Sequence, residues 1–116
     1  MSILKLSLSR FEYTHFLTSL KASPVEIISD KEKAELVKDI IVKLILKLLK
    51  RYDSLKLNHN VITLTRLEMI AYRSLMKVNY EYLCEYDKII VMEVLTAIDK
   101  KEIYTIKPFN IISDGT

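Results

Sequence analysis

The longest hydrophobic segment of the chain runs from Lys31 to Tyr52 and reads KEKAELVKDIIVKLILKLLKRY. At 3.6 residues per turn, its charged residues recur every four positions and form one narrow polar ridge, while apolar residues cover most of the remaining circumference. The ridge comprises Lys31, Glu35, Asp39, Lys43, Lys47 and Arg51. A helix with so wide an apolar face is normally buried among its neighbours. The pattern therefore predicts a central core helix over 31–53, with Ser29 as N-cap and Glu32 completing a capping box.

A shorter helix is predicted before this segment. Apolar residues recur at steps of three and four over 10–22, and Ser9 with Glu12 has capping-box spacing. Ahead of it, Ile3 to Ser9 reads ILKLSLS and alternates apolar with polar residues, which predicts a short, half-buried strand.

The polar connection from Asp53 to Thr63 is expected to be a loop with one extended side. After it, apolar residues again recur at helical spacing. Thr65 and Glu68 have capping-box spacing at the start of a predicted helix over 65–85. Its expected inward stripe consists of Leu64, Leu67, Ile70, Ala71, Leu75, Val78 and Tyr82.

A fourth helix is predicted over 87–104, with a turn around Glu85 to Asp87 and Asp87 as its cap. One continuous helix from 65 to 104 remains an alternative, because no Gly or Pro interrupts the segment. The tail from Thr105 to Thr116 is expected to dock on the domain, and the pattern allows it to lie beside the N-terminal strand. Its apolar residues are Ile106, Phe109, Ile111 and Ile112.

Composition supports one helical domain over 1–116. Half of the 116 residues are hydrophobic, and the chain contains one Gly and two Pro, which is too few for a hairpin-rich β fold. The fold class is therefore predicted to be mainly α: a single-domain antiparallel bundle of about four helices. A short N-terminal strand that pairs with the C-terminal tail is an optional addition.

The expected location is the cytoplasm or the interior of a particle, and not the secretory route. Charges such as Lys38 and Asp39 interrupt the central apolar segment, so no transmembrane helix is expected. A single cysteine, Cys84, cannot form an internal disulfide, and we expect it to be a small helix-packing residue.

Signatures of catalysis are missing from the sequence. No glycine precedes Gly115 to build a phosphate-binding loop, and His15, His59 and Cys84 lack the spacing of metal ligands. On a helix with aromatic neighbours, His15 is expected to be packed or hydrogen-bonded rather than a general base. The expectation is a non-enzymatic protein without a cofactor.

Tyrosines supply the best candidate for a protein interface. Tyr80, Tyr82 and Tyr86 lie among Glu81 and Glu85, with Tyr82 and Tyr86 expected on one helix face. Tyrosine is enriched at interfaces because it combines a large apolar area with a polar tip. Packing at the edge of the core is the alternative interpretation.

A basic patch is the other candidate surface. It comprises Lys43, Lys47, Lys50, Arg51 and Lys56. The net charge of +3 is too small to demand a polyanionic partner, and Asp39 and Asp53 dilute the patch. A small nucleic-acid-binding or regulatory protein is therefore the alternative function.

The leading expectation is an interaction or assembly protein that binds a protein partner or itself. It would form a homo-oligomer or dock onto a larger complex, including a virion or another particle. Basic helix ends and acidic helix ends are expected at opposite poles, so that unlike poles meet between subunits in a head-to-tail arrangement.

Overall fold

A two-stranded antiparallel sheet joins the start of the chain to its middle. The computed structural model describes residues 3–113, with side chains described as far as Lys101. Strand β1 (Ile3–Leu8) pairs with β2 (Asn60–Thr65) in a register that places Leu4 opposite Leu64 and Leu6 opposite Ile62. These apolar cross-strand pairs stabilise the sheet. The pairing of the N-terminal strand with the C-terminal tail is thus wrong, since β1 pairs with the extended side of the polar connection.

The fold is mainly helical, as expected. Over the described residues it contains four α-helices: α1 (Arg10–Lys21), α2 (Lys31–Lys50), α3 (Arg66–Asn79) and α4 (Glu85–Ser113). Single turns of 3₁₀-helix adjoin them, namely η1 (Val25–Ile27), η2 (Tyr52–Ser54) and η3 (Tyr80–Tyr82).

Local capping decides where the helices begin. Both predicted capping boxes, Ser9 with Glu12 and Thr65 with Glu68, are confirmed by reciprocal hydrogen bonds. The cap predicted for α2 is wrong, because Asp30 and not Ser29 accepts a hydrogen bond from the Lys33 N–H at 3.1 Å. A carboxylate at this position also interacts favourably with the helix dipole.

The break between α3 and α4 comes earlier than predicted. The chain leaves the helix through η3 and resumes it at Glu85, so the alternative of one continuous helix is wrong. Asp87 lies within the first turn of α4 and is not its cap. Helix α4 continues to Ser113, but Ile106, Phe109, Ile111 and Ile112 lie outside the residues whose side chains are described, and so does their predicted docking.

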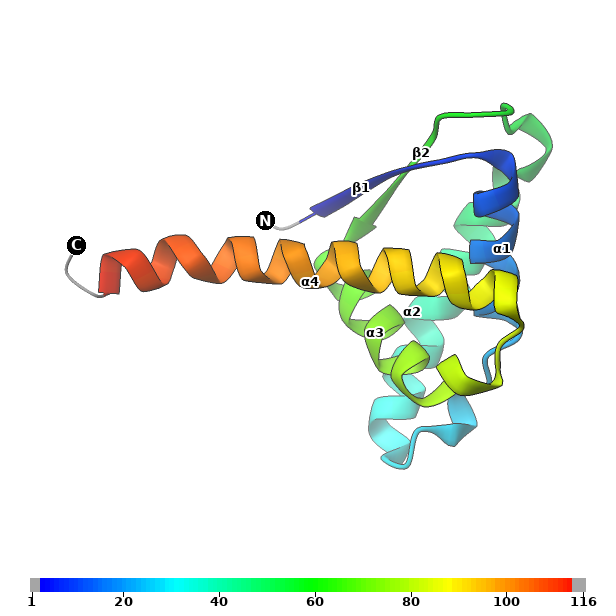
Figure 1. Cartoon of the computed structure of the whole chain (residues 1–116). Coiled ribbons are helices and arrows are strands. Elements are labelled where there is room, and N and C mark those ends of the chain that lie inside the picture. Colours follow the sequence, from blue (N-terminus) through cyan, green and yellow to red (C-terminus); the bar gives the residue numbers. More distant parts are fainter. Residues whose placement is uncertain (1–2, 114–116) are drawn as a thin grey trace.

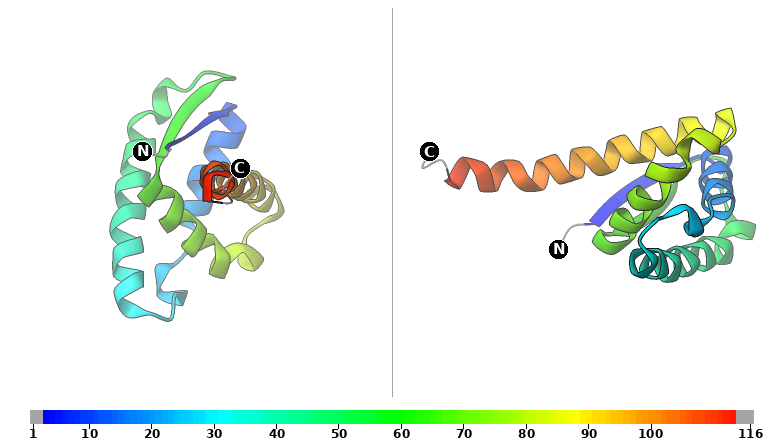
Figure 2. Two further views of the ribbon diagram at one scale, coloured as in Figure 1. Left: turned by 90° about the vertical axis from the view of Figure 1, so that its left-hand side faces the viewer. Right: turned by 90° about the horizontal axis from the view of Figure 1, so that it is seen from below.

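Helix α4 runs across α2 rather than alongside it (Figures 1 and 2), so the antiparallel bundle is not confirmed. The last part of α4 extends away from the other elements (Figure 1). The radius of gyration of 15.2 Å accordingly exceeds the value of about 13 Å for a compact chain of this length. Within the described part of the chain, no helix has the length and apolar character needed to cross a membrane.

Only one side of α2 is covered. A seam of Val37, Ile41, Leu44 and Leu48 is buried, whereas Leu36, Val42, Leu46 and Leu49 are exposed. The expected burial of the whole apolar circumference is therefore wrong. The reason is that α1, η1 and α3 pack on α2, while α4 packs on α1, α3 and β1.

The buried side of α3 differs in phase from the predicted stripe. Leu64, Ala71 and Leu75 are buried as expected, but Leu67 and Ile70 are exposed. Their places in the core are taken by Met69, Tyr72 and Met76. The ring of Tyr72 lies 5.3 Å from that of Phe16 on α1 and sets which side of α3 faces inward.

Candidate functional site

Helices α1 and α4 meet at a partly buried, hydrogen-bonded pair of side chains, His15 and Asp87. The Nδ1 atom of His15 lies 2.8 Å from Oδ1 of Asp87, whose residue is only 2% exposed. Breaking such a pair leaves an uncompensated buried charge, which is strongly unfavourable. His15 is thus hydrogen-bonded, as predicted, and the pair fixes α1 against the first turn of α4.

Aromatic rings cover the His15–Asp87 pair on the solvent side. The ring of Phe11 lies 4.3 Å from that of His15 and 5.8 Å from that of Tyr86, which it meets edge-on. The rings of His15 and Tyr86 are 5.7 Å apart. Phe11 and Tyr86 remain exposed on their outer sides. Aromatic surface therefore faces solvent over a rigid, hydrogen-bonded base.

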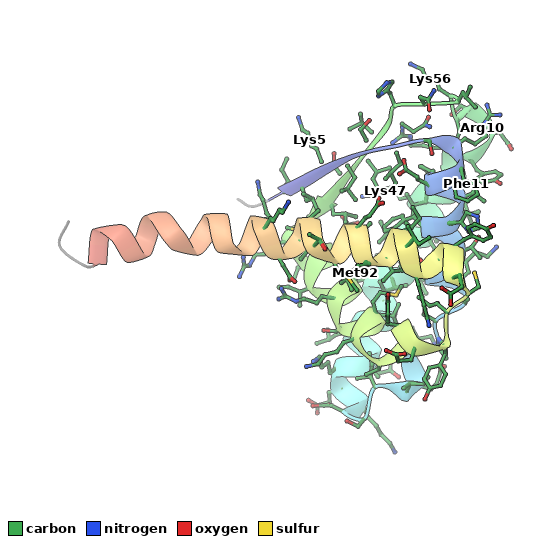
Figure 3. All side chains as sticks on the ribbon, viewed as in Figure 1. Lys5, Arg10, Phe11, Lys47, Lys56 and Met92 are labelled. Atoms are coloured by element: carbon green, nitrogen blue, oxygen red, sulfur yellow. The ribbon has the colours of Figure 1, made fainter. Side chains whose placement is uncertain are left out.

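Helix α4 continues this apolar surface with Ile89 and Met92, which follow Tyr86 at three-residue steps. We call Phe11, Tyr86, Ile89 and Met92 the α4 face; each is between 48% and 61% exposed. Glu85 and Glu93 are exposed next to these residues on α4. In Figure 3, Phe11 lies beside the start of α4 and Met92 lies further along the helix. Phe11, Ile89 and Met92 were not among the site residues predicted from the sequence.

The predicted tyrosine interface is only partly assembled. Tyr80 is half-buried, with the Lys88 Nζ 5.6 Å from its ring centre, whereas Tyr82 is 80% exposed on η3. Because a break separates η3 from α4, Tyr82 and Tyr86 do not share one helix face, and that expectation is wrong. Glu81 and Glu85 are exposed.

Cys84 lies in this break and is exposed, so its prediction as a helix-packing residue is wrong. The residue that anchors the break in the core is its neighbour Leu83, which is buried.

Two tyrosine hydroxyls are buried in the core, that of Tyr13 on α1 and that of Tyr72 on α3. That of Tyr13 donates a hydrogen bond of 2.6 Å to the Leu48 carbonyl of α2, and burial raises the pKa of Tyr13. The hydroxyl of Tyr72 has no hydrogen-bond partner among the described residues. Burial strongly raises the pKa of Tyr72; the neighbouring Ser19 side chain partly opposes this shift, and the negative charge of Asp87 adds to it.

The predicted basic patch serves in part to hold β2. Lys47 donates to the Thr63 carbonyl and pairs with Glu68 at 3.1 Å, and Arg51 donates to the Val61 carbonyl. Lys43 and Lys50 are exposed on α2, while Lys56 lies on the loop before β2, well apart from Lys47 (Figure 3). Nucleic-acid binding by this patch stays a prediction.

A hollow with a volume of about 680 Å³ separates η1 and the start of α2 from α3. It is lined by apolar residues such as Ile27 and Ile70, and its rim carries Asp30, Lys33 and Lys77. These charged side chains are exposed, whereas a small-molecule site usually encloses its ligand around a few fixed polar groups. Among the described residues, no group of three or more His, Cys, Asp or Glu is placed to hold a metal ion.

Comparison with known proteins adds no relative: no family model, no curated protein and no solved structure matches the chain. A functional proposal must therefore rest on the geometry of the α4 face and its surroundings.

Proposed function

We propose that this chain is a non-enzymatic helical interaction protein that binds a protein partner through the α4 face, in a homo-oligomer or a larger complex. The observation that carries the proposal is the exposure of four large apolar side chains on one rigid surface. Contiguous apolar patches rimmed by polar residues are typical of protein interfaces, and Tyr, Phe and Met are enriched there.

Rigidity of the surface supports the same function. Phe11 and Tyr86 are in ring contact with each other and with His15, which is itself fixed by Asp87. Side chains that are already ordered lose less conformational entropy when a partner binds. The Phe11 and Tyr86 part of the α4 face is therefore pre-organised for binding.

Site-specific photo-crosslinking in the native cell tests this function. A benzophenone amino acid in place of Met92 is expected to give a covalent adduct with a protein. The same probe in place of Lys33, an exposed residue outside the face, is expected to give none. Absence of an adduct from Met92, Ile89 and Phe11, in variants with unchanged circular dichroism, would overturn the proposal.

A further inference from the structure

A second apolar surface lies on α2 and has no partner among the described residues. Val42, Leu46 and Leu49 follow one another at steps of four and three, so they share one side of the helix. Tyr52 lines the same hollow as Leu49 and extends this surface past the helix end. We call Val42, Leu46, Leu49 and Tyr52 the α2 strip; these residues are between 42% and 53% exposed.

The two surfaces carry opposite charges around their apolar centres. The α4 face lies beside Glu85 and Glu93, with Glu81 on the preceding turn, and the base Lys88 lies four residues before Met92. The α2 strip is bordered by Lys38, Lys43 and Lys50 on α2 and by Lys21 on α1, against the three acids Glu35, Asp39 and Asp53. Matching of an acidic surface with a basic one favours encounter and fixes orientation. Two α4 faces would instead bring like charges together.

A hollow beside the α2 strip offers a place for an anchoring side chain. It has a volume of about 260 Å³ and lies between α1 and the end of α2. Leu17, Leu49 and Tyr52 give it apolar walls, and Thr14, Thr18 and Lys21 complete its lining. Aromatic residues seated in such pockets commonly dominate the binding energy of an interface. Tyr86 or Phe11 of the α4 face would supply one.

The two surfaces face different sides of the protein. Exposed residues of α1, such as Thr18, separate them, and α2 and the start of α4 lie on opposite sides in Figure 2, left. One copy therefore cannot bring its own surfaces together. A contact between unlike surfaces of two copies is heterologous and continues into a ring or a filament.

We propose that the partner of the α4 face is the α2 strip of a second copy of this chain, so that copies associate head to tail. This inference rests on the proposed function and names the partner within it. Charges at the rim make the association salt-sensitive, because screening weakens contacts between exposed charges.

Mixing two single-face variants tests the arrangement. Ile89→Asp disrupts only the α4 face, and Leu46→Asp disrupts only the α2 strip. By sedimentation at low salt, the unmodified chain is expected to grow beyond its 13.6 kDa monomer mass as concentration rises. Each variant alone is expected to remain a monomer. Their mixture is expected to form a 1:1 dimer and nothing larger, because it retains one intact contact.

Leu57→Asp is the matched control, since Leu57 is an exposed leucine outside both surfaces, and this variant should assemble like the unmodified chain. Circular dichroism establishes that each variant is folded. The inference would be overturned if the unmodified chain stays a monomer at every concentration, or if Leu46→Asp assembles like the unmodified chain. A crosslink from Met92 to a different protein would then still support the proposed function, so the two failures are distinguishable.

Discussion

Helices α2 and α4 are both long and rich in apolar residues, yet the rest of the protein contacts them in different ways. Helix α2 is held by a seam of four aliphatic side chains and leaves a second apolar strip exposed. Helix α4 is held by a comparable seam and also by Asp87, a buried acid paired with His15 on α1. Apolar content therefore indicates that a helix will form, but the neighbours decide which of its sides is covered.

Two leucines on α2 give the largest contrast in this comparison. Leu44 is fully buried, whereas Leu46 is 53% exposed. Leu44→Ala should lower the free energy of unfolding by about 3 to 4 kcal/mol, because it creates a core cavity. Leu46→Ala should change it by less than about 0.5 kcal/mol. Urea denaturation measures both values, and equal losses would show that the α2 strip is covered within one chain.

The polar attachment of α4 is tested by His15→Ala. This variant leaves the Asp87 carboxylate buried without its partner and should cost about 2 to 3 kcal/mol, less than a fully buried pair because His15 is partly exposed. Thr18→Ala, an exposed change on the same helix, is the control. Adding Asp87→Asn to His15→Ala should recover part of the loss, since no charge then remains buried. If the double variant is no more stable than His15→Ala, the loss caused by His15→Ala is not electrostatic in origin.

Alkaline pH should lower the free energy of unfolding through Tyr72, which lies on α3. Its raised pKa means that the folded state keeps the phenolic proton after the unfolded state, with an ordinary pKa of 10.0, has begun to lose it. Stability contributed by this group is full below pH 10 and falls as pH rises above it, by about 1.4 kcal/mol per pH unit. Above pH 10, the free energy of unfolding of Tyr72→Phe should therefore fall less steeply with pH than that of the unmodified chain, by that amount per pH unit. If the free energies of unfolding of Tyr72→Phe and of the unmodified chain fall in parallel with pH, the alkaline loss of stability does not come from Tyr72.

The two buried tyrosines give the smallest expected effects at neutral pH. Tyr13→Phe removes the hydrogen bond to the Leu48 carbonyl of α2 and should cost about 1 kcal/mol. Tyr72→Phe removes a hydroxyl with no partner among the described residues, and it should be neutral or slightly stabilising. Thermal unfolding of both variants distinguishes them, and a loss for Tyr72→Phe equal to that for Tyr13→Phe would indicate that the neighbouring Ser19 side chain is hydrogen-bonded to the Tyr72 hydroxyl.

Most features that depend on neighbouring residues were predictable from the sequence, although the N-cap of α2 is Asp30 and not the predicted Ser29. The capping boxes at Ser9 and Thr65 and the alternation in β1 were correct, because a few adjacent residues determine them. Contacts between distant residues were not predictable in this way. His15 and Asp87 are 72 residues apart, and β1 pairs with a strand more than 50 residues away.

The candidate site likewise depends on contacts between residues that are distant in the sequence. Tyr86 was predicted from its residue type, whereas Ile89 and Met92 were not predicted. Phe11 joins them only because α1 packs beside α4, which no local pattern reveals. Likewise, the exposure of Leu46 and Leu49 follows from the absence of a helix over that side of α2 among the described residues.

The hydrogen bonds from Lys47 and Arg51 to β2 have a consequence for aggregation. A two-stranded sheet has two edges, and an open edge invites other chains to add strands. The carbonyls of Thr63 and Val61 on β2 are already occupied by Lys47 and Arg51, while β1 carries an exposed lysine, Lys5, near its middle. Lysine on an edge strand discourages strand addition. Both edges are thus protected against amyloid-like growth, although the protein exposes apolar helical surface elsewhere.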